Sequence, residues 1–256
     1  MPETDTMLRR LPREALVALV LLTRLPLPAL PARAFAVQAR AGWAFALAGL
    51  VVGGIGCLVG LVALSAGLPG VLAAGLCLFA QVVVTGAMHE DGLADVADGF
   101  WGGFTRERRL EIMKDSRTGS YGVLALVLSV GLRWGALASL LEVAPGAVIA
   151  AACLSRGLLP GLMTALPQAR PGGLSAKVGV PGWIVAAAAL GLGLGLAAGF
   201  GGIGALSGLA AALVAVAALA AVARVKIGGQ TGDVLGAAQQ LGEIAVLLAL
   251  VAFHSP

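Results

Sequence analysis

The sequence predicts an all-α fold: a polytopic integral membrane helical bundle of about seven transmembrane helices, with an N-terminal interfacial helix. Of the 256 residues, 59% are hydrophobic and 12% are charged, and the mean hydropathy is +0.97. A soluble domain has about 25% charged residues. The 38 glycines suit helices that pack closely through small residues. Because no polar stretch is long enough to build a second core, residues 1–256 are predicted to form a single membrane domain.

The apolar runs give the elements in order. Residues 1–41 are predicted to form a cytoplasmic or interfacial segment, in which a helix over residues 13–30 lies at the membrane surface and ends in a proline-rich turn. A membrane span needs about 20 mostly apolar residues. Runs of about that length predict seven spans, at residues 42–64, 70–88, 120–141, 144–162, 181–200, 203–223 and 234–253.

The distribution of charge predicts the orientation. The N-terminal segment carries six arginines, namely Arg9, Arg10, Arg13, Arg24, Arg33 and Arg40. By the positive-inside rule this end is cytoplasmic, and seven spans then bring every polar motif to the same membrane face. The net charge of +4 does not indicate nucleic-acid binding, because the basic residues lie at helix ends and in one polar loop. The three isolated cysteines indicate neither a disulfide framework nor a zinc site.

One segment, His89–Tyr121, holds seven of the 13 acidic residues and five of the 17 basic ones. Within it Asp91, Asp95 and Asp98 stand at i, i+4 and i+7, which places them on one face of a helix. Such carboxylates repel one another, and a hard divalent cation, Mg²⁺ above all, prefers oxygen ligands of this kind. Residues 89–119 are therefore predicted to form a cytoplasmic catalytic loop that binds metal. The alternative is a solvated helix face with incidental acids.

Basic and polar side chains near this acidic face predict a phosphate-binding site. The candidates are Arg106, Arg109, Lys114, Arg117, Arg156, Gln230 and Thr231. Arginine forks suit phosphate oxygens, and phosphoryl transfer depends on positioning and charge neutralisation. Asp115 lies in the basic stretch and is a fourth candidate metal ligand. For the stretch that begins at Arg106, the alternative is a plain amphipathic interfacial helix.

Four more residues have two interpretations each. Asp233 heads a polar stripe that enters the last span, and it is either catalytic or part of a helix cap. His89 is either a catalytic or phosphate-contacting residue or a surface histidine. Arg133 and Arg156 lie inside predicted spans, where a charge needs a partner or a watery cavity. For Arg156 the alternative is snorkelling toward the near surface.

Together these motifs resemble the cobalamin-5′-phosphate synthase family (adenosylcobinamide-GDP ribazoletransferase). The resemblance lies in HEDGLADVADG at residues 89–99, RRLEIMKDSRTG at 108–119, TRLP at 23–26, SRG at 155–157 and GGQTGDVLGA at 228–237. Their order and spacing match from near residue 20 to near residue 245, and Arg133 also matches a basic residue of the third span. Glu90 departs from the pattern, because it stands where leucine is frequent.

The resemblance implies an enzyme that joins adenosylcobinamide-GDP to α-ribazole or α-ribazole 5′-phosphate. GMP is released and adenosylcobalamin, or its 5′-phosphate, is formed in the late nucleotide-loop assembly step of cobalamin biosynthesis. It also implies a Mg²⁺ requirement and a multi-pass protein of the bacterial cytoplasmic (inner) membrane, with its active site facing the cytoplasm. Other cobamide-assembly enzymes are candidate partners. The base that deprotonates the attacking hydroxyl would be His89, Asp98 or Asp233.

Three other functions are weighed against this one. A small transporter would use Arg133, Arg156 and Asp233 to line a path, but it should show internal repeats and mid-membrane polarity, and neither is seen in the sequence. A CDP-alcohol-phosphotransferase-like enzyme has a similar acidic pattern, but its full motif is not met. A structural subunit of a cobamide-making complex would tolerate loss of the aspartates.

Overall fold

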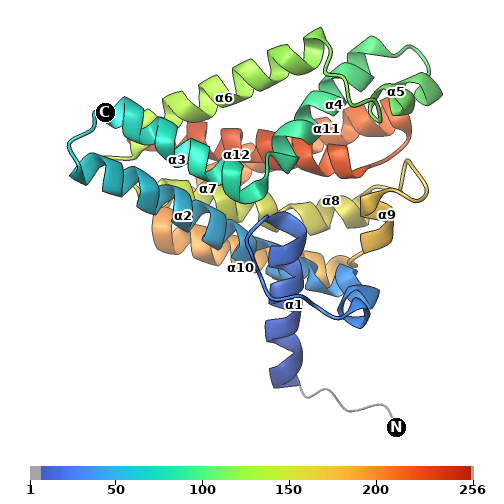
Figure 1. Cartoon of the computed structure of the whole chain (residues 1–256), viewed down its shortest axis with the longest axis horizontal. Helices are drawn as coiled ribbons and strands as arrows, with labels where there is room; N and C mark the ends of the chain where they lie inside the picture. Colours follow the sequence, from blue (N-terminus) through green and yellow to red (C-terminus); the bar gives the residue numbers. More distant parts are fainter. Residues whose placement is uncertain (1–6, 255–256) are drawn as a thin grey trace.

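The computed structural model describes residues 7–254, which form an α-helical bundle (Figure 1). Among these residues the only β pairing is an isolated bridge between Gln168 and Gln230. The predicted all-α class is therefore confirmed.

The helices follow one another with short connections. In chain order they are α1 (Met7–Leu22), the 3-10 helix η1 (Ala32–Ala44), α2 (Phe45–Ser65), α3 (Gly70–Thr85), α4 (Met88–Gly102), α5 (Arg106–Ile112), α6 (Ser120–Leu140), α7 (Gly146–Gly157), α8 (Leu159–Ala165), α9 (Leu174–Val178), α10 (Trp183–Gly201), α11 (Gly204–Ile227) and α12 (Gly232–His254). Helix α1 projects from the bundle, and it lies earlier in the chain than the interfacial helix predicted at 13–30 (Figure 1).

Six helical segments within residues 7–254 are long and apolar enough to cross a membrane, or seven if the bent pair α3–α4 counts as one span. The six are Gln38–Ser65, Ser120–Leu140, Gly146–Ala165, Trp183–Gly201, Gly204–Ile227 and Gly232–His254. The prediction of about seven spans is confirmed within this range. The predicted second span corresponds to α3, which at 16 residues is short for a full crossing.

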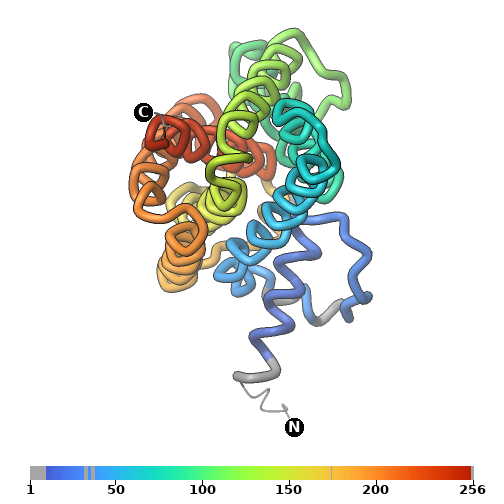
Figure 2. The backbone as a smooth tube through the Cα atoms, turned by 90° about the vertical axis from the view of Figure 1, so that its left-hand side faces the viewer, coloured from blue at the N-terminus to red at the C-terminus, as the bar shows by residue number. Residues whose placement is uncertain are grey.

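The spans differ in how much of each the bundle buries. In Gly146–Ala165, which comprises α7 and α8, 83% of the most apolar 18-residue stretch is buried inside the bundle. In α12 the corresponding share is 67%. In α6, α10 and α11 the share is 28% or less. Helices α7 and α12 therefore form the centre, and the other three present apolar side chains outward, as lipid-facing helices do. Figure 2 shows the packed helices from the side of the bundle where the chain ends.

The charged segment after α3 begins with a helix packed into the bundle, so the helix face expected for Asp91, Asp95 and Asp98 is present within residues 89–119. Gly86 (φ 64°) and Ala87 (φ 57°) adopt left-handed conformations, and α4 leaves α3 at an angle of 86°. Nine of the 15 residues of α4 are buried, because Leu93, Val96 and Phe100 form an apolar side next to the acids. The loop is confined to two short connections around α5.

Candidate active site

A polar cavity of about 330 Å³ lies between the first turns of α4 and α12 and the loop before α9. Asp91 and Asp233 supply negative charge to its lining, and Arg24 and Arg170 supply positive charge. Thr231 also lines it. Four charged side chains of both signs around one solvent-filled space provide a surface suited to a ligand that carries phosphate and a bound cation.

The positive and negative sides of this cavity meet at one ion pair. Arg170 Nη2 donates to Asp233 Oδ2 at 3.1 Å, and Thr231 Oγ1 donates to the same oxygen at 3.2 Å. Thr231 also caps α12, because its hydroxyl accepts a bond from the amide of Val234 at 3.3 Å. Arg170 Nε is buried and has no hydrogen-bond partner within residues 7–254. Arg170 therefore keeps an unused donor beside the cavity.

Two glycines bring the helices that carry the acids together. A Cβ on Gly92 would come within 2.8 Å of the Asp233 carbonyl oxygen, and one on Gly236 within 3.3 Å of the Gly92 Cα. Such close approach of two backbones requires residues without side chains. The crossing places Asp91 of α4 and Asp233 of α12 on the same cavity, although they are far apart in sequence.

Asp98 and Asp115 line a second cavity, of about 260 Å³, together with Arg117. The Asp98 carboxylate is buried and accepts bonds from the amides of Gly119 at 2.7 Å and Gly122 at 2.9 Å, so it fixes the start of α6. Asp115 is exposed and pairs with Arg117 at 2.7 Å. Hydrogen bonds from Arg117 lower the pKa of Asp115 to about 2.

Asp91 lines the first cavity, and Asp98 and Asp115 line the second, so these predicted metal ligands do not form one cluster. Asp95 stands between them on α4, where it interacts with the charges of Asp233, Asp91 and Asp98. Among the residues described, no group of three or more acids, histidines or cysteines is arranged to hold a metal ion. The carboxylate of Asp91 on the polar cavity still fits Mg²⁺, which is commonly held by one or two carboxylates together with substrate phosphates and water.

Most of the predicted phosphate ligands are engaged elsewhere. Arg106 donates to the carbonyl oxygens of Ile227 and Ala169, both at 2.8 Å, and Arg109 donates to that of Lys226 at 3.0 Å. These bonds hold α5 against the end of α11. Lys114 is exposed, and it lies in the lining of neither polar cavity. Of the seven candidates, Thr231 lines the first cavity and Arg117 the second.

Gln230 and Arg156 make contacts within the fold, and neither lines the polar cavity. Gln230 is fully buried and accepts a bond from Ser175 Oγ at 2.6 Å, so it fixes the loop before α9. Arg156 is 2% exposed and pairs with Glu243 at 3.3 Å in the centre of the bundle. Its Nη1 donates to Glu243 of α12 and to the Ala152 carbonyl oxygen of its own helix, because a charge so far from solvent must be neutralised locally.

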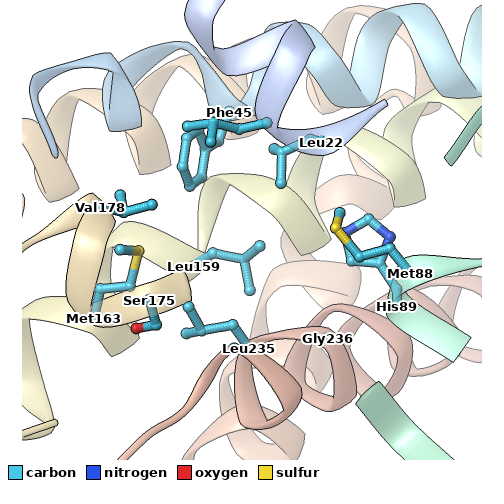
Figure 3. Close-up of a pocket in the computed structure, with 12 residues that line it drawn as sticks. Leu22, Phe45, Met88, His89, Leu159, Met163, Ser175, Val178, Leu235 and Gly236 are labelled. Atoms are coloured by element: carbon cyan, nitrogen blue, oxygen red, sulfur yellow. The ribbon is translucent and has the colours of Figure 1, made fainter. Parts of the chain in front are cut away.

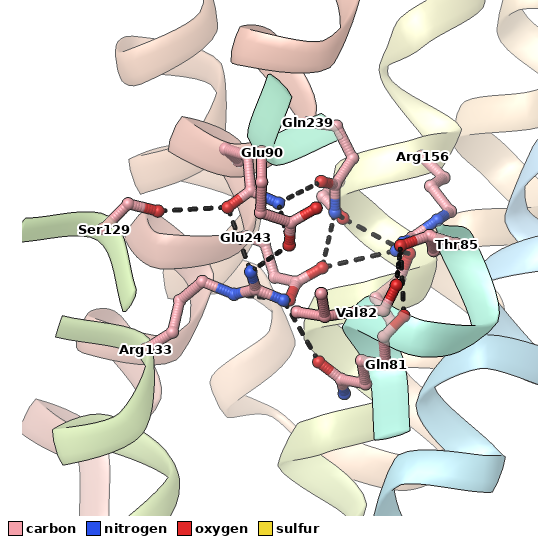
Figure 4. Close-up of polar contacts among 12 residues, drawn as sticks. Gln81, Val82, Thr85, Glu90, Ser129, Arg133, Arg156, Gln239 and Glu243 are labelled. Carbon is pink, nitrogen blue, oxygen red and sulfur yellow. Dashed lines mark hydrogen bonds and ion pairs between the residues drawn. The ribbon is translucent and has the colours of Figure 1, made fainter. Parts of the chain in front are cut away.

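Arg133 is the centre of that buried network (Figure 4). It pairs with Glu90 at 2.6 Å and with Glu243 at 2.8 Å, and it donates to Gln81 at 3.2 Å. The partner expected for an intramembrane arginine is therefore present. Glu90 and Glu243 received no role from the sequence, although an unpaired buried arginine is a signal to look for acids on neighbouring helices.

His89 lies on the buried side of α4, away from Asp91, and is 2% exposed. It lines an apolar cavity whose walls include Leu22, Phe45, Leu159 and Leu235 (Figure 3). Its Nε2 has no hydrogen-bond partner within the described part of the chain. The structure therefore does not place His89 on the polar cavity where the acids lie.

Sequence reasoning assigned no phosphate role to Arg24 or Arg170, which are the cations of the polar cavity. Arg24 lies in the motif TRLP, and Arg170 lies in a basic stretch, ARPGGLSAK, at residues 169–177. Only the fold shows that these motifs meet at the first turns of α4 and α12.

The fold and this site define a polytopic membrane protein with a charged, phosphate-compatible cavity between helix ends. A family model described as cobalamin-5-phosphate synthase matches residues 14–251, and the chain belongs to that family.

Three relatives are each named adenosylcobinamide-GDP ribazoletransferase. The protein from Bradyrhizobium diazoefficiens is 46% identical over 99% of this chain and 98% of its own length. That from Mesorhizobium japonicum is 45% identical over 94% and 93%, and that from Azorhizobium caulinodans is 44% identical over 93% and 95%. A comparison with solved structures finds no match.

Proposed function

We propose that this protein is an adenosylcobinamide-GDP ribazoletransferase that joins adenosylcobinamide-GDP to α-ribazole or its 5′-phosphate. Membership of the family over nearly the whole chain supports the reaction. The observation that carries the site is the cavity on which Asp91 and Asp233 face Arg24 and Arg170. We place this activity in the bacterial cytoplasmic membrane with the cavity toward the cytoplasm, because the arginine-rich N-terminal segment favours that side.

In this proposal the diphosphate of the activated corrinoid enters the polar cavity. Arg24 and Arg170 bind its oxygens, since guanidinium groups suit phosphate and Arg170 has an unused donor there. Asp91 would hold Mg²⁺ together with phosphate oxygens and water, and the ion would supply charge neutralisation for the diphosphate and for departing GMP.

The nucleophile is the ribose 3′-hydroxyl of α-ribazole. Its oxygen forms a bond to the phosphorus on the aminopropanol arm, the bond from that phosphorus to GMP breaks, and GMP leaves with the bonding electrons. Asp233 is the proposed base, because it lines the polar cavity, His89 lies in an apolar wall and both oxygens of Asp98 accept amide bonds. The hydrogen bond from Arg170 holds the Asp233 carboxylate in position until the hydroxyl arrives.

An assay on purified protein tests the proposal. We expect conversion of adenosylcobinamide-GDP and α-ribazole 5′-phosphate to product and GMP, lost on chelation and restored by Mg²⁺. Asp91→Ala and Asp233→Ala should each reduce turnover at least about a hundredfold. Glu107→Ala, an exposed acid of α5, is the matched control and should keep full activity. Near-normal turnover by Asp91→Ala would contradict the site, and turnover without any divalent cation would contradict the Mg²⁺ role.

A further inference from the structure

The apolar cavity beside His89 is narrow and adjoins the polar cavity. Its space is about 70 Å³, which is too small for a corrinoid ring and smaller than a two-ring base, so an aromatic ligand requires side chains of the lining to move. Met88 and Met163 flank it, and such flexible side chains can adjust to a flat ligand. Met88, Ser175 and Gly232 line both cavities, so a single ligand can extend from one into the other.

His89 Nε2 is the polar atom of this cavity that lacks a partner among residues 7–254. A buried polar atom without a hydrogen bond is unfavourable by about 1 to 3 kcal/mol, so its presence needs a reason. A neutral imidazole nitrogen either donates or accepts one hydrogen bond. A ligand that fits is therefore flat and apolar, and carries one ring atom able to hydrogen-bond with Nε2.

We infer that this cavity binds the fused heteroaromatic base of the ribazole substrate. The inference rests on the proposed function and adds the location of one substrate. A dimethylbenzimidazole ring attached to ribose is flat and largely apolar, and it has one free ring nitrogen that accepts a hydrogen bond. His89 donates to that nitrogen, and the ribose passes Met88 and Gly232 into the polar cavity, where Asp233 lies.

The positions of His89 and Asp91 on α4 support this division of the site. Two residues apart on a helix, they point to different sides, and each lines a different cavity. The first turn of α4 therefore contacts both substrates. His89 contacts the heteroaromatic base of the ribazole, and Asp91 contacts the phosphate-bearing partner. A lipid acyl chain would fill the apolar wall but leave Nε2 without a partner.

The test uses the full-length protein in detergent and two variants of the cavity. Leu235→Phe fills the space, and His89→Leu removes the hydrogen bond at similar volume. Leu241→Phe, also half-buried on α12 and outside the cavity lining, is the matched control. Equilibrium dialysis measures binding of α-ribazole directly, without turnover, and steady-state kinetics measures KM for each substrate. Thermal melts show whether each variant is folded.

We expect Leu235→Phe and His89→Leu to weaken α-ribazole binding and raise its KM about tenfold or more. The KM for adenosylcobinamide-GDP should change less than about threefold, and Leu241→Phe should resemble the wild type. Turnover with unchanged α-ribazole binding in a folded variant would overturn the base subsite while the proposed function stands. Binding that both variants weaken, in a protein without turnover, would support the subsite and count against the function. A rise in the corrinoid KM alone would also overturn the subsite.

Discussion

The three aspartates on one face of α4 have different surroundings. Asp91 is exposed at the polar cavity, Asp95 is half-buried between two cavities, and Asp98 is buried against two backbone amides. Equal spacing in the sequence therefore does not give equal chemistry. Asp91 is free to contact a ligand, while Asp98 satisfies the first amides of α6 and so positions that helix.

The Arg170–Asp233 pair makes a residue-scale prediction. Arg170→Gln removes the cation and releases Asp233, so we expect KM for adenosylcobinamide-GDP to rise about tenfold. Lys177→Gln, an exposed cation of α9 outside the polar cavity lining, is the control. The KM for adenosylcobinamide-GDP is measured for both variants by steady-state kinetics with the ribazole substrate saturating. An Arg170→Gln enzyme with an unchanged KM would show that Arg170 does not bind the diphosphate.

At the scale of elements, the site depends on how α4 meets α12. The left-handed turn at Gly86 and Ala87 redirects the chain by 86°, and Gly92 and Gly236 allow the two helices to touch. The result places a cavity between the first turns of both helices. Without the bend, α4 would continue the direction of α3, and its acids would not face Asp233.

Replacing a contact glycine tests this arrangement. Gly236→Val introduces a branched side chain against the backbone of α4, and we expect about 1 to 3 kcal/mol of destabilisation with loss of most activity. Gly195→Val on α10, where an added Cβ meets nothing within 4 Å, should be tolerated. Thermal melts measure the stability of each variant, and the transferase assay measures its activity. Equal effects of the two substitutions would mean that the crossing is not critical.

For the whole molecule, the buried network joins five helices. Glu90 comes from α4, Arg133 from α6, Arg156 from α7 and Glu243 from α12, and Gln81 adds α3. The two arginines and two glutamates balance in charge. Because a lone charge in this interior is strongly unfavourable, the four are expected to hold a single arrangement of the central helices.

Removing one member of the network should destabilise the entire bundle. Arg133→Met leaves Glu90 and Glu243 short of a partner, and we expect about 3 to 5 kcal/mol of destabilisation. The double variant with Glu90→Gln should recover part of it. Arg224→Met, at an exposed position near the end of α11, is the control. The melting temperature in detergent is the measurement, and a wild-type value for Arg133→Met would show that the network is dispensable.

The membrane class, the number of spans and the acidic face of α4 could all be predicted from the amino-acid sequence. Each depends on local pattern: runs of about 20 apolar residues, and carboxylates spaced at a helical period. The family followed from ordered motifs along most of the chain, and the comparisons confirm it. Arg133 was also expected to face either a partner or a watery cavity, because an unpaired charge in a membrane is unfavourable.

Which charged side chains share a cavity became visible only in the folded protein. Arg24 and Arg170 share a cavity with Asp91 and Asp233 because the chain bends between α3 and α4 and because glycines let α4 and α12 cross closely. Neither feature appears as a repeating pattern in the sequence. Arg156 turned inward for the same kind of reason, since its nearest acid, Glu243, lies 87 residues away in the chain. Contacts between distant segments depend on how helices pack, and local patterns do not encode that packing.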